Sequence, residues 1–133
     1  MAQQYPPSAR LVRSKYNSVK VQIDGITFDS KAEARRFAEL KVLRDAGQID
    51  NLQLQKKFLL LPSKRNAEGY LERETSYVAD FVYVDSSGET IVEDTKSPAT
   101  RTPEYVIKRK LMLHTHGITI REIGVKKKKA AKQ

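Results

Sequence analysis

The residues of this chain that could do chemistry together are two aspartates and a lysine, Asp80, Asp94 and Lys96. They lie in residues 77–84 and 90–96, two segments rich in β-branched and aromatic side chains with a Ser-Ser-Gly turn between them, so we predict a β-hairpin. Because side chains alternate between the two faces of a strand, Asp94 and Lys96 share one face. Burying an unpaired carboxylate is unfavourable by several kcal/mol, so these acids need a partner or a metal ion.

An ordinary interpretation of Asp94 and Lys96 competes with a functional one. An acid and a lysine two residues apart on a strand are most often a solvated face with a weak ion pair. Asp80 favours a site, because a single acid is unexpected in the middle of an otherwise apolar strand. The neighbouring acid Glu93 falls on the opposite face, so alternation favours Asp94 over Glu93 as the acid that acts with Lys96.

A third acid, Glu33, comes from a predicted helix. This helix begins after Ser30, which is typical of an N-cap, and stops at Gly47. Glu33 fits a capping box, in which its carboxylate bonds back to the Ser30 amide. Glu33 also shares the helix face of Phe37 and Leu40, which would direct it to the sheet and toward the two aspartates. The sequence leaves both roles open.

The remaining segments predict the elements that position these residues. Asp24-Gly25 is a strong signal for a two-residue hairpin turn, and Thr102 followed by Pro103 predicts the start of a second helix. Gln55 precedes an apolar run and either faces the same cleft or is an ordinary polar strand residue. We therefore predict an α/β (α+β) domain with a central mixed β-sheet flanked by helices. The predicted elements are a hairpin at 19–28, a helix at 31–46, a strand at 54–61, a polar loop at 62–69, the central hairpin, a helix at 103–114 and a strand at 118–123.

Length and composition restrict the class of protein. With 133 residues, the chain is long enough for one domain with a substantial core. Charged residues make up 31% and no apolar stretch approaches a membrane-spanning length, which predicts a soluble protein without a membrane partner. The absence of cysteine excludes disulfides and thiolate metal sites, and the first ten residues lack the apolar segment of a signal peptide. We expect a cytoplasmic protein.

The net charge of +9 is concentrated at the two ends of the chain. Residues 1–20 hold four basic residues and no acid, and residues 126–133 hold five, so the body between them is neutral. Basic ends on a neutral body favour arms that bind a polyanion, most simply a nucleic acid, although they could serve solubility alone. We predict a flexible arm at 1–18, a domain at 19–124 and a lysine-rich tail at 125–133.

With a helix bearing Glu33, a strand bearing Asp80 and a strand bearing Asp94 and Lys96, the chain resembles the PD-(D/E)XK nuclease superfamily. The likeness covers most of the predicted domain and is closest to small phage-encoded proteins of this class, whose fold Holliday-junction resolvases share. Ala79 stands where the superfamily motif has its proline. The segments that carry the resemblance are Phe-Asp-Ser-Lys-Ala-Glu-Ala at 28–34, Tyr-Val-Ala-Asp-Phe at 77–81 and Val-Glu-Asp-Thr-Lys at 92–96.

The resemblance implies a restriction-endonuclease-like fold and a metal-dependent DNA endonuclease that is specific for branched DNA or Holliday junctions, with a place in phage recombination or replication. It implies Mg²⁺ or Mn²⁺ as cofactor, because hard cations prefer oxygen ligands. The metal would activate a water molecule, and Lys96 would orient that water or neutralise the transition state. The implied residues are Glu33, Asp80, Asp94 and the Thr95 carbonyl for the metal; Glu33, Asp80, Asp94 and Lys96 for catalysis; Lys108, Arg109, Lys110, Lys126, Lys127, Lys128 and Lys129 for DNA; and Gln55 as an accessory residue.

Two other functions stay open from the sequence alone. The chain could be a catalytically inactive DNA-binding or regulatory protein on a nuclease fold, because function does not follow from fold. It could also be a basic protein that docks on RNA or on another replication protein. The complete set of two aspartates and a lysine favours the nuclease, whether it acts as a monomer or as a homodimer.

Overall fold

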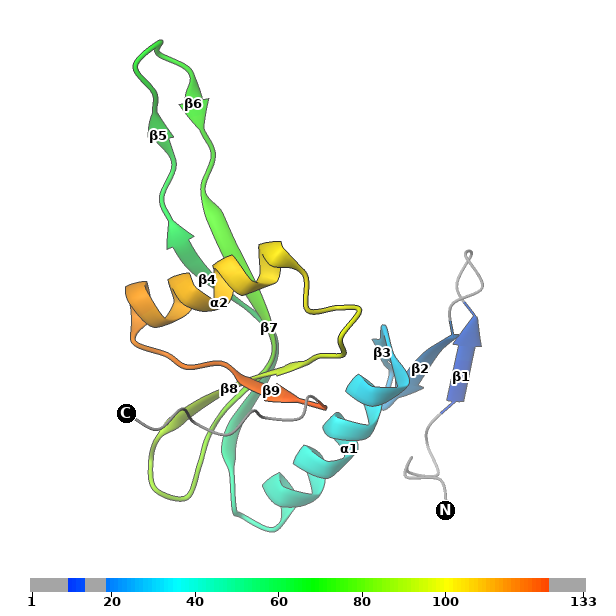
Figure 1. Cartoon of the computed structure of the whole chain (residues 1–133). Helices are drawn as coiled ribbons and strands as arrows, with labels where there is room; N and C mark the ends of the chain where they lie inside the picture. Colours follow the sequence, from blue (N-terminus) through cyan, green and yellow to red (C-terminus); the bar gives the residue numbers. More distant parts are fainter. Residues whose placement is uncertain (1–9, 14–18, 125–133) are drawn as a thin grey trace, which may run out of the picture.

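The structure, a computed structural model, describes residues 10–13 and 19–124 of the chain. It is a mixed α+β fold whose central mixed sheet is accompanied by two helices, as predicted (Figure 1). The elements are β1 (Arg10–Arg13), β2 (Val19–Ile23), β3 (Ile26–Phe28), α1 (Lys31–Asp45), β4 (Asp50–Leu61), β5 (Lys64–Arg65), β6 (Leu71–Glu72), β7 (Thr75–Val84), β8 (Thr90–Thr95), α2 (Pro103–His116) and β9 (Arg121–Ile123).

The central sheet has the strand order β4-β7-β8-β9. The β4–β7 and β7–β8 pairs are antiparallel, whereas β8 and β9 are parallel and are connected through α2. A parallel pair needs such a crossover, and here the helix provides it. In the register of β7 on β8, Phe81 lies opposite Glu93 and Val82 lies opposite Val92. Consecutive residues of β8 therefore face opposite sides of the sheet.

The predicted local signals are confirmed at three turns and caps. Asp24 and Gly25 both have positive φ, 53° and 80°, as a type I′ hairpin turn requires. The Ser30 hydroxyl accepts a hydrogen bond from the Glu33 amide at 3.0 Å and begins α1. The Thr102 hydroxyl caps α2 in the same way. Short-range chemistry thus determines where both helices begin.

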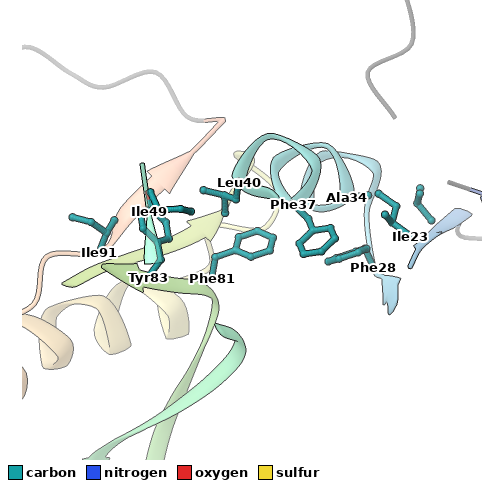
Figure 2. Close-up of a cluster of buried hydrophobic side chains, with 10 residues drawn as sticks. Ile23, Phe28, Ala34, Phe37, Leu40, Ile49, Phe81, Tyr83 and Ile91 are labelled. Atoms are coloured by element: carbon teal, nitrogen blue, oxygen red, sulfur yellow. The ribbon is translucent and has the colours of Figure 1, made fainter. Parts of the chain in front are cut away.

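Two apolar clusters cover the two sides of the sheet. On the α1 side, the Phe37 ring lies 5.0 Å from the Phe28 ring and 6.4 Å from the Phe81 ring, measured between centroids (Figure 2). On the α2 side, Tyr105 and Met112 pack on the sheet. The first cluster contains Val21, Ile23, Phe28, Ala34, Phe37, Leu40, Ile49, Phe81, Tyr83 and Ile91, and the second contains Leu60, Tyr77, Ala79, Val82, Val92, Tyr105, Met112 and Ile120.

The strands β4 and β7 change faces near their middle. In β4, Leu54 packs against the α1 cluster and Phe58 against the α2 cluster, although regular alternation would place both on one face. Gln55 lies between them with φ at +52°, a left-handed conformation that is rare for a residue with a side chain. In β7, Ala79 and Phe81 are divided between the clusters in the same way. The break therefore falls at Gln55 on one strand and beside Ala79 on the other.

Three predictions about chain organisation were wrong. Residues 10–13, assigned to a flexible N-terminal arm, form β1, whose backbone pairs with β2. The polar loop predicted at 62–69 is part of an exposed hairpin in which β5 pairs with β6 and which projects from the end of β4 and β7 (Figure 1). The last strand is shorter than predicted, because β9 covers Arg121–Ile123 alone. The two hairpins depend on backbone hydrogen bonds, which the polar composition that guided the predictions does not reveal.

Candidate active site

Asp94 and Lys96 lie together on the α2 side of β8, as strand alternation predicts. The Lys96 Nζ atom is 3.1 Å from Asp94 Oδ1, and the Tyr77 hydroxyl donates a hydrogen bond to Asp94 Oδ2 at 2.7 Å. Lys96 Nζ also lies 4.2 Å from the centroid of the Tyr105 ring, a cation–π contact. Burial and the charge of Asp94 raise the pKa of Tyr77, so its hydroxyl remains a donor. Each Asp94 oxygen thus has a defined partner.

Asp80 approaches the same strand from β7. Its Oδ2 atom accepts a hydrogen bond from the Thr95 amide at 2.8 Å. Burial and the nearby charge of Asp94 together raise the pKa of Asp80 to about 7, against the opposing effect of the hydrogen bond from the Thr95 amide. Asp80 therefore sits close enough to Asp94 for the two carboxylates to repel one another.

Glu33 reaches the site from the first turn of α1. Its side chain is only 8% exposed and accepts a hydrogen bond from Gln55 Nε2 at 3.0 Å. Burial, together with the charges of Asp29 and Asp94 and against the opposing charge of Lys96, raises the pKa of Glu33 to about 7. The Glu33 amide is capped by Ser30, but its carboxylate is directed to Gln55. The Glu33 carboxylate therefore takes the sheet-facing position, and of the predicted capping box only the Ser30 side-chain cap is observed among the described residues.

The structure thus brings together the four side chains predicted for catalysis, from α1, β7 and β8. It adds Gln55, predicted as an accessory residue, through its bond to Glu33. It also adds Tyr77, which we did not predict. Regular alternation puts Tyr77 and Asp80 on opposite faces of β7, and only the change of face beside Ala79 brings the tyrosine to Asp94. No local sequence signal marks that break.

Glu93 occupies the opposite side of β8 and has its own partners. Its side chain is fully buried and accepts bonds from Arg36 Nε at 2.8 Å and Arg36 Nη2 at 2.6 Å. The Tyr83 hydroxyl also donates to Glu93, and Arg121 lies 4.0 Å away. The bidentate hydrogen bonds to Glu93 raise the pKa of Arg36. The pair joins α1 to β8 beside Asp94. Glu93 therefore has a structural partner, Arg36, and does not act with Lys96.

The donor set suits a hard divalent cation, which prefers carboxylate and carbonyl oxygens. The raised pKa values of Glu33 and Asp80 show how strongly burial and crowding disfavour their charges, and a cation would relieve this. The Thr95 hydroxyl is a buried oxygen without a hydrogen-bond partner among the described residues. Within the same residues, no three Asp, Glu or His side chains are already grouped closely enough to hold a metal ion.

The residues predicted to bind DNA differ in their surroundings. On α2, Lys108 pairs with Glu104 at 3.3 Å, and Arg109 pairs with Glu122 of β9 at 3.0 Å. Lys110 is exposed. Arg109 therefore connects α2 to β9 and is less available to a phosphate than the sequence suggested. The four lysines at 126–129 lie outside the described residues.

Residues 13–130 match a family described as protein of unknown function, DUF1064. The chain belongs to the DUF1064 family. The match includes every described residue of the candidate site, so the site is part of the family's domain and not an addition to it. Searches of curated proteins and of solved structures give no match. Neither helix among the described residues is long and apolar enough to cross a membrane.

The pair between Arg36 and Glu93 generates a stability prediction. Glu93→Gln leaves the half-buried Arg36 guanidinium without its anion, so we expect the free energy of unfolding to fall by about 3 kcal/mol. Glu39→Gln is the matched control, because Glu39 pairs with the same arginine at 3.6 Å from a 58% exposed side chain. It should change stability by less than about 1 kcal/mol. Urea unfolding of both variants measures the difference, and equal effects would contradict the structural role of Glu93.

The carboxyl groups of Glu33 and Asp80 predict a pH dependence of stability. A folded-state pKa of about 7 lies above the ordinary values of 4.5 and 3.8, so the folded protein holds protons that the unfolded chain has released. Stability should therefore fall as pH rises from about 4 to about 7. Asp80→Asn should remove part of this slope and raise stability near pH 8, on the order of 2 kcal/mol.

Urea unfolding of wild type and Asp80→Asn at several pH values tests this prediction. Asp45→Asn is the control, because Asp45 is an exposed acid at the end of α1. It should keep the wild-type slope. A slope that Asp80→Asn leaves unchanged would show that Asp80 is not the group that resists ionisation.

Proposed function

We propose that this protein is a metal-dependent DNA endonuclease of the PD-(D/E)XK type with a restriction-endonuclease-like fold, acting on branched DNA such as Holliday junctions in phage recombination or replication. The observation that carries the proposal is the meeting of Asp80, Asp94, Lys96 and Glu33 at one place in the fold. Lys96 contacts Asp94 at 3.1 Å, and Asp94 raises the pKa of the other two acids. Three carboxyl groups that interact electrostatically, with one ammonium beside Asp94, give an anionic site that suits a cation.

In the proposed site, the Asp80 and Asp94 carboxylates, with Glu33 and the Thr95 carbonyl, would hold Mg²⁺ or Mn²⁺. When bound, such an ion lowers the pKa of a water molecule and stabilises charge on a phosphate. Lys96 contacts Asp94 and the Tyr105 ring, where its ammonium can orient water or neutralise a phosphate oxygen. Gln55 holds Glu33 in place through its amide.

Binding of the substrate backbone is assigned to basic residues away from the acids. Lys110 is exposed on α2, and Lys108 is half-buried beside it. Together with the lysines of the basic tail, these side chains would contact phosphates without reading base sequence. Their contribution should therefore affect the affinity for DNA and its salt dependence, whereas the acids should affect the cleavage step.

Cleavage assays test the proposal. Purified protein is incubated with four-way, nicked and linear DNA in Mg²⁺ or Mn²⁺, and product formation is followed over time. We expect wild type to cut branched DNA, and Asp94→Asn and Lys96→Met to lose about 100-fold or more in rate while still binding DNA. Asp45→Asn, which replaces an exposed acid, should cut like wild type. A wild-type protein that cuts none of these substrates, or an Asp94→Asn variant that cuts normally, would refute the proposal.

Metal binding should also appear as stability, without any DNA. A ligand that binds only the folded state stabilises it, by about 2.7 kcal/mol at roughly 100 times its Kd. We expect Mg²⁺ or Mn²⁺ to raise the melting temperature of wild type but not of Asp94→Asn. The rise should be larger near pH 8 than near pH 5, because protons compete for carboxyl groups whose pKa is about 7. A metal effect of equal size in both proteins would indicate binding elsewhere.

A further inference from the structure

We propose that Tyr77 is a positioning residue, which holds the Asp94 carboxylate in the orientation that a divalent cation requires. The inference rests on the proposed function and deepens it. Tyr77 is 4% exposed, and its hydroxyl donates to Asp94 Oδ2 at 2.7 Å. The other oxygen, Oδ1, faces Lys96 at 3.1 Å. The two partners therefore hold the carboxylate from both ends.

The chemical need for such a donor follows from the freedom of an aspartate side chain. The last torsion of aspartate is broad and roughly two-fold, so a carboxylate without partners samples many orientations. A neutral phenol can fix one oxygen without adding a positive charge that would compete with the metal. Partners of this kind are known to affect metal affinity by about 10–100-fold when they are removed. Tyr77 is suited to this role, because it is a buried donor on the neighbouring strand.

The same chemistry occurs on the opposite face of β8 and supplies a matched control. There the Tyr83 hydroxyl, also on β7, donates to the buried carboxylate of Glu93. Tyr77→Phe and Tyr83→Phe each remove one oxygen from a buried ring and leave one carboxylate oxygen with fewer donors. They differ in which acid is affected, Asp94 or Glu93, and Tyr83→Phe also removes the acceptor of a hydrogen bond from Arg121 Nη1 at 3.3 Å. A change specific to Tyr77→Phe therefore reports on the site and not on the general loss of a buried hydroxyl.

Isothermal titration calorimetry with Mn²⁺, without DNA, measures the metal affinity of wild type, Tyr77→Phe and Tyr83→Phe. We expect the Kd of Tyr77→Phe to rise about 10-fold with unchanged stoichiometry, and that of Tyr83→Phe to change by less than about 2-fold. Circular dichroism checks that all three are folded. In cleavage assays, the metal concentration for half-maximal rate should shift by the same factor, while the rate at saturating Mn²⁺ returns close to wild type.

The outcomes separate this inference from the proposed function. Wild-type Mn²⁺ affinity in Tyr77→Phe, beside an active wild type, would overturn the role of Tyr77 and leave the nuclease proposal intact. Equal weakening in Tyr77→Phe and Tyr83→Phe would also overturn it, since the effect would then be a general loosening of the hairpin. A wild type that neither binds Mn²⁺ nor cuts DNA would refute the proposed function, and the positioning role with it.

Discussion

The bidentate pair between Arg36 and Glu93 is the interaction on which the rest of the structure depends. It holds α1 to the central strand β8, and its carboxylate, that of Glu93, is fully buried. Glu33 precedes Arg36 by three residues and so shares its helix face, while Asp94 follows Glu93 on the strand. Because the pair fixes the position of α1 relative to β8, it also fixes the distance between Glu33 on the helix and Asp94 on the strand.

The buried acids of the candidate site lower the stability of the folded protein. Burial raises the pKa of both Glu33 and Asp80, which means that their ionised forms destabilise the folded protein near neutral pH. The two apolar clusters on either side of the sheet provide the compensating stability. Gln55 contributes a further local strain through its left-handed backbone. Strain and buried charge concentrated at one place are common at functional sites.

Much of the fold could be predicted because its signals are local. The Asp24-Gly25 turn, the Ser30 and Thr102 caps and the central hairpin each depend on a few neighbouring residues. The faces of Asp94 and Lys96 followed from strand alternation. Glu33 could be placed on the sheet side of its helix for a similar reason, because helical spacing puts it in line with the apolar stripe.

The residues whose roles we did not predict, Tyr77 and Arg36, act through contacts between distant segments. Tyr77 reaches Asp94 only because β7 changes faces, and Arg36 meets Glu93 across 57 positions of the chain. The pairing of β1 with β2 likewise depends on backbone hydrogen bonds that composition does not reveal. Composition and spacing found the acids and the lysine, whereas the groups that orient and neutralise them become visible only in three dimensions.

The contrast between Glu93 and Asp94 supports the proposed cation site. Both are buried acids on β8, and each receives a hydrogen bond from a tyrosine of β7. Glu93 is neutralised by Arg36, with Arg121 at 4.0 Å, so its side of the sheet is balanced in charge. Asp94 has Lys96, whose charge also lowers the pKa of Glu33, and Asp80 and Glu33 add two further carboxyl groups near Asp94. Ionisation of Asp80 and Glu33, whose pKa values are raised to about 7, therefore adds negative charge beside Asp94, which a divalent cation would offset at neutral pH.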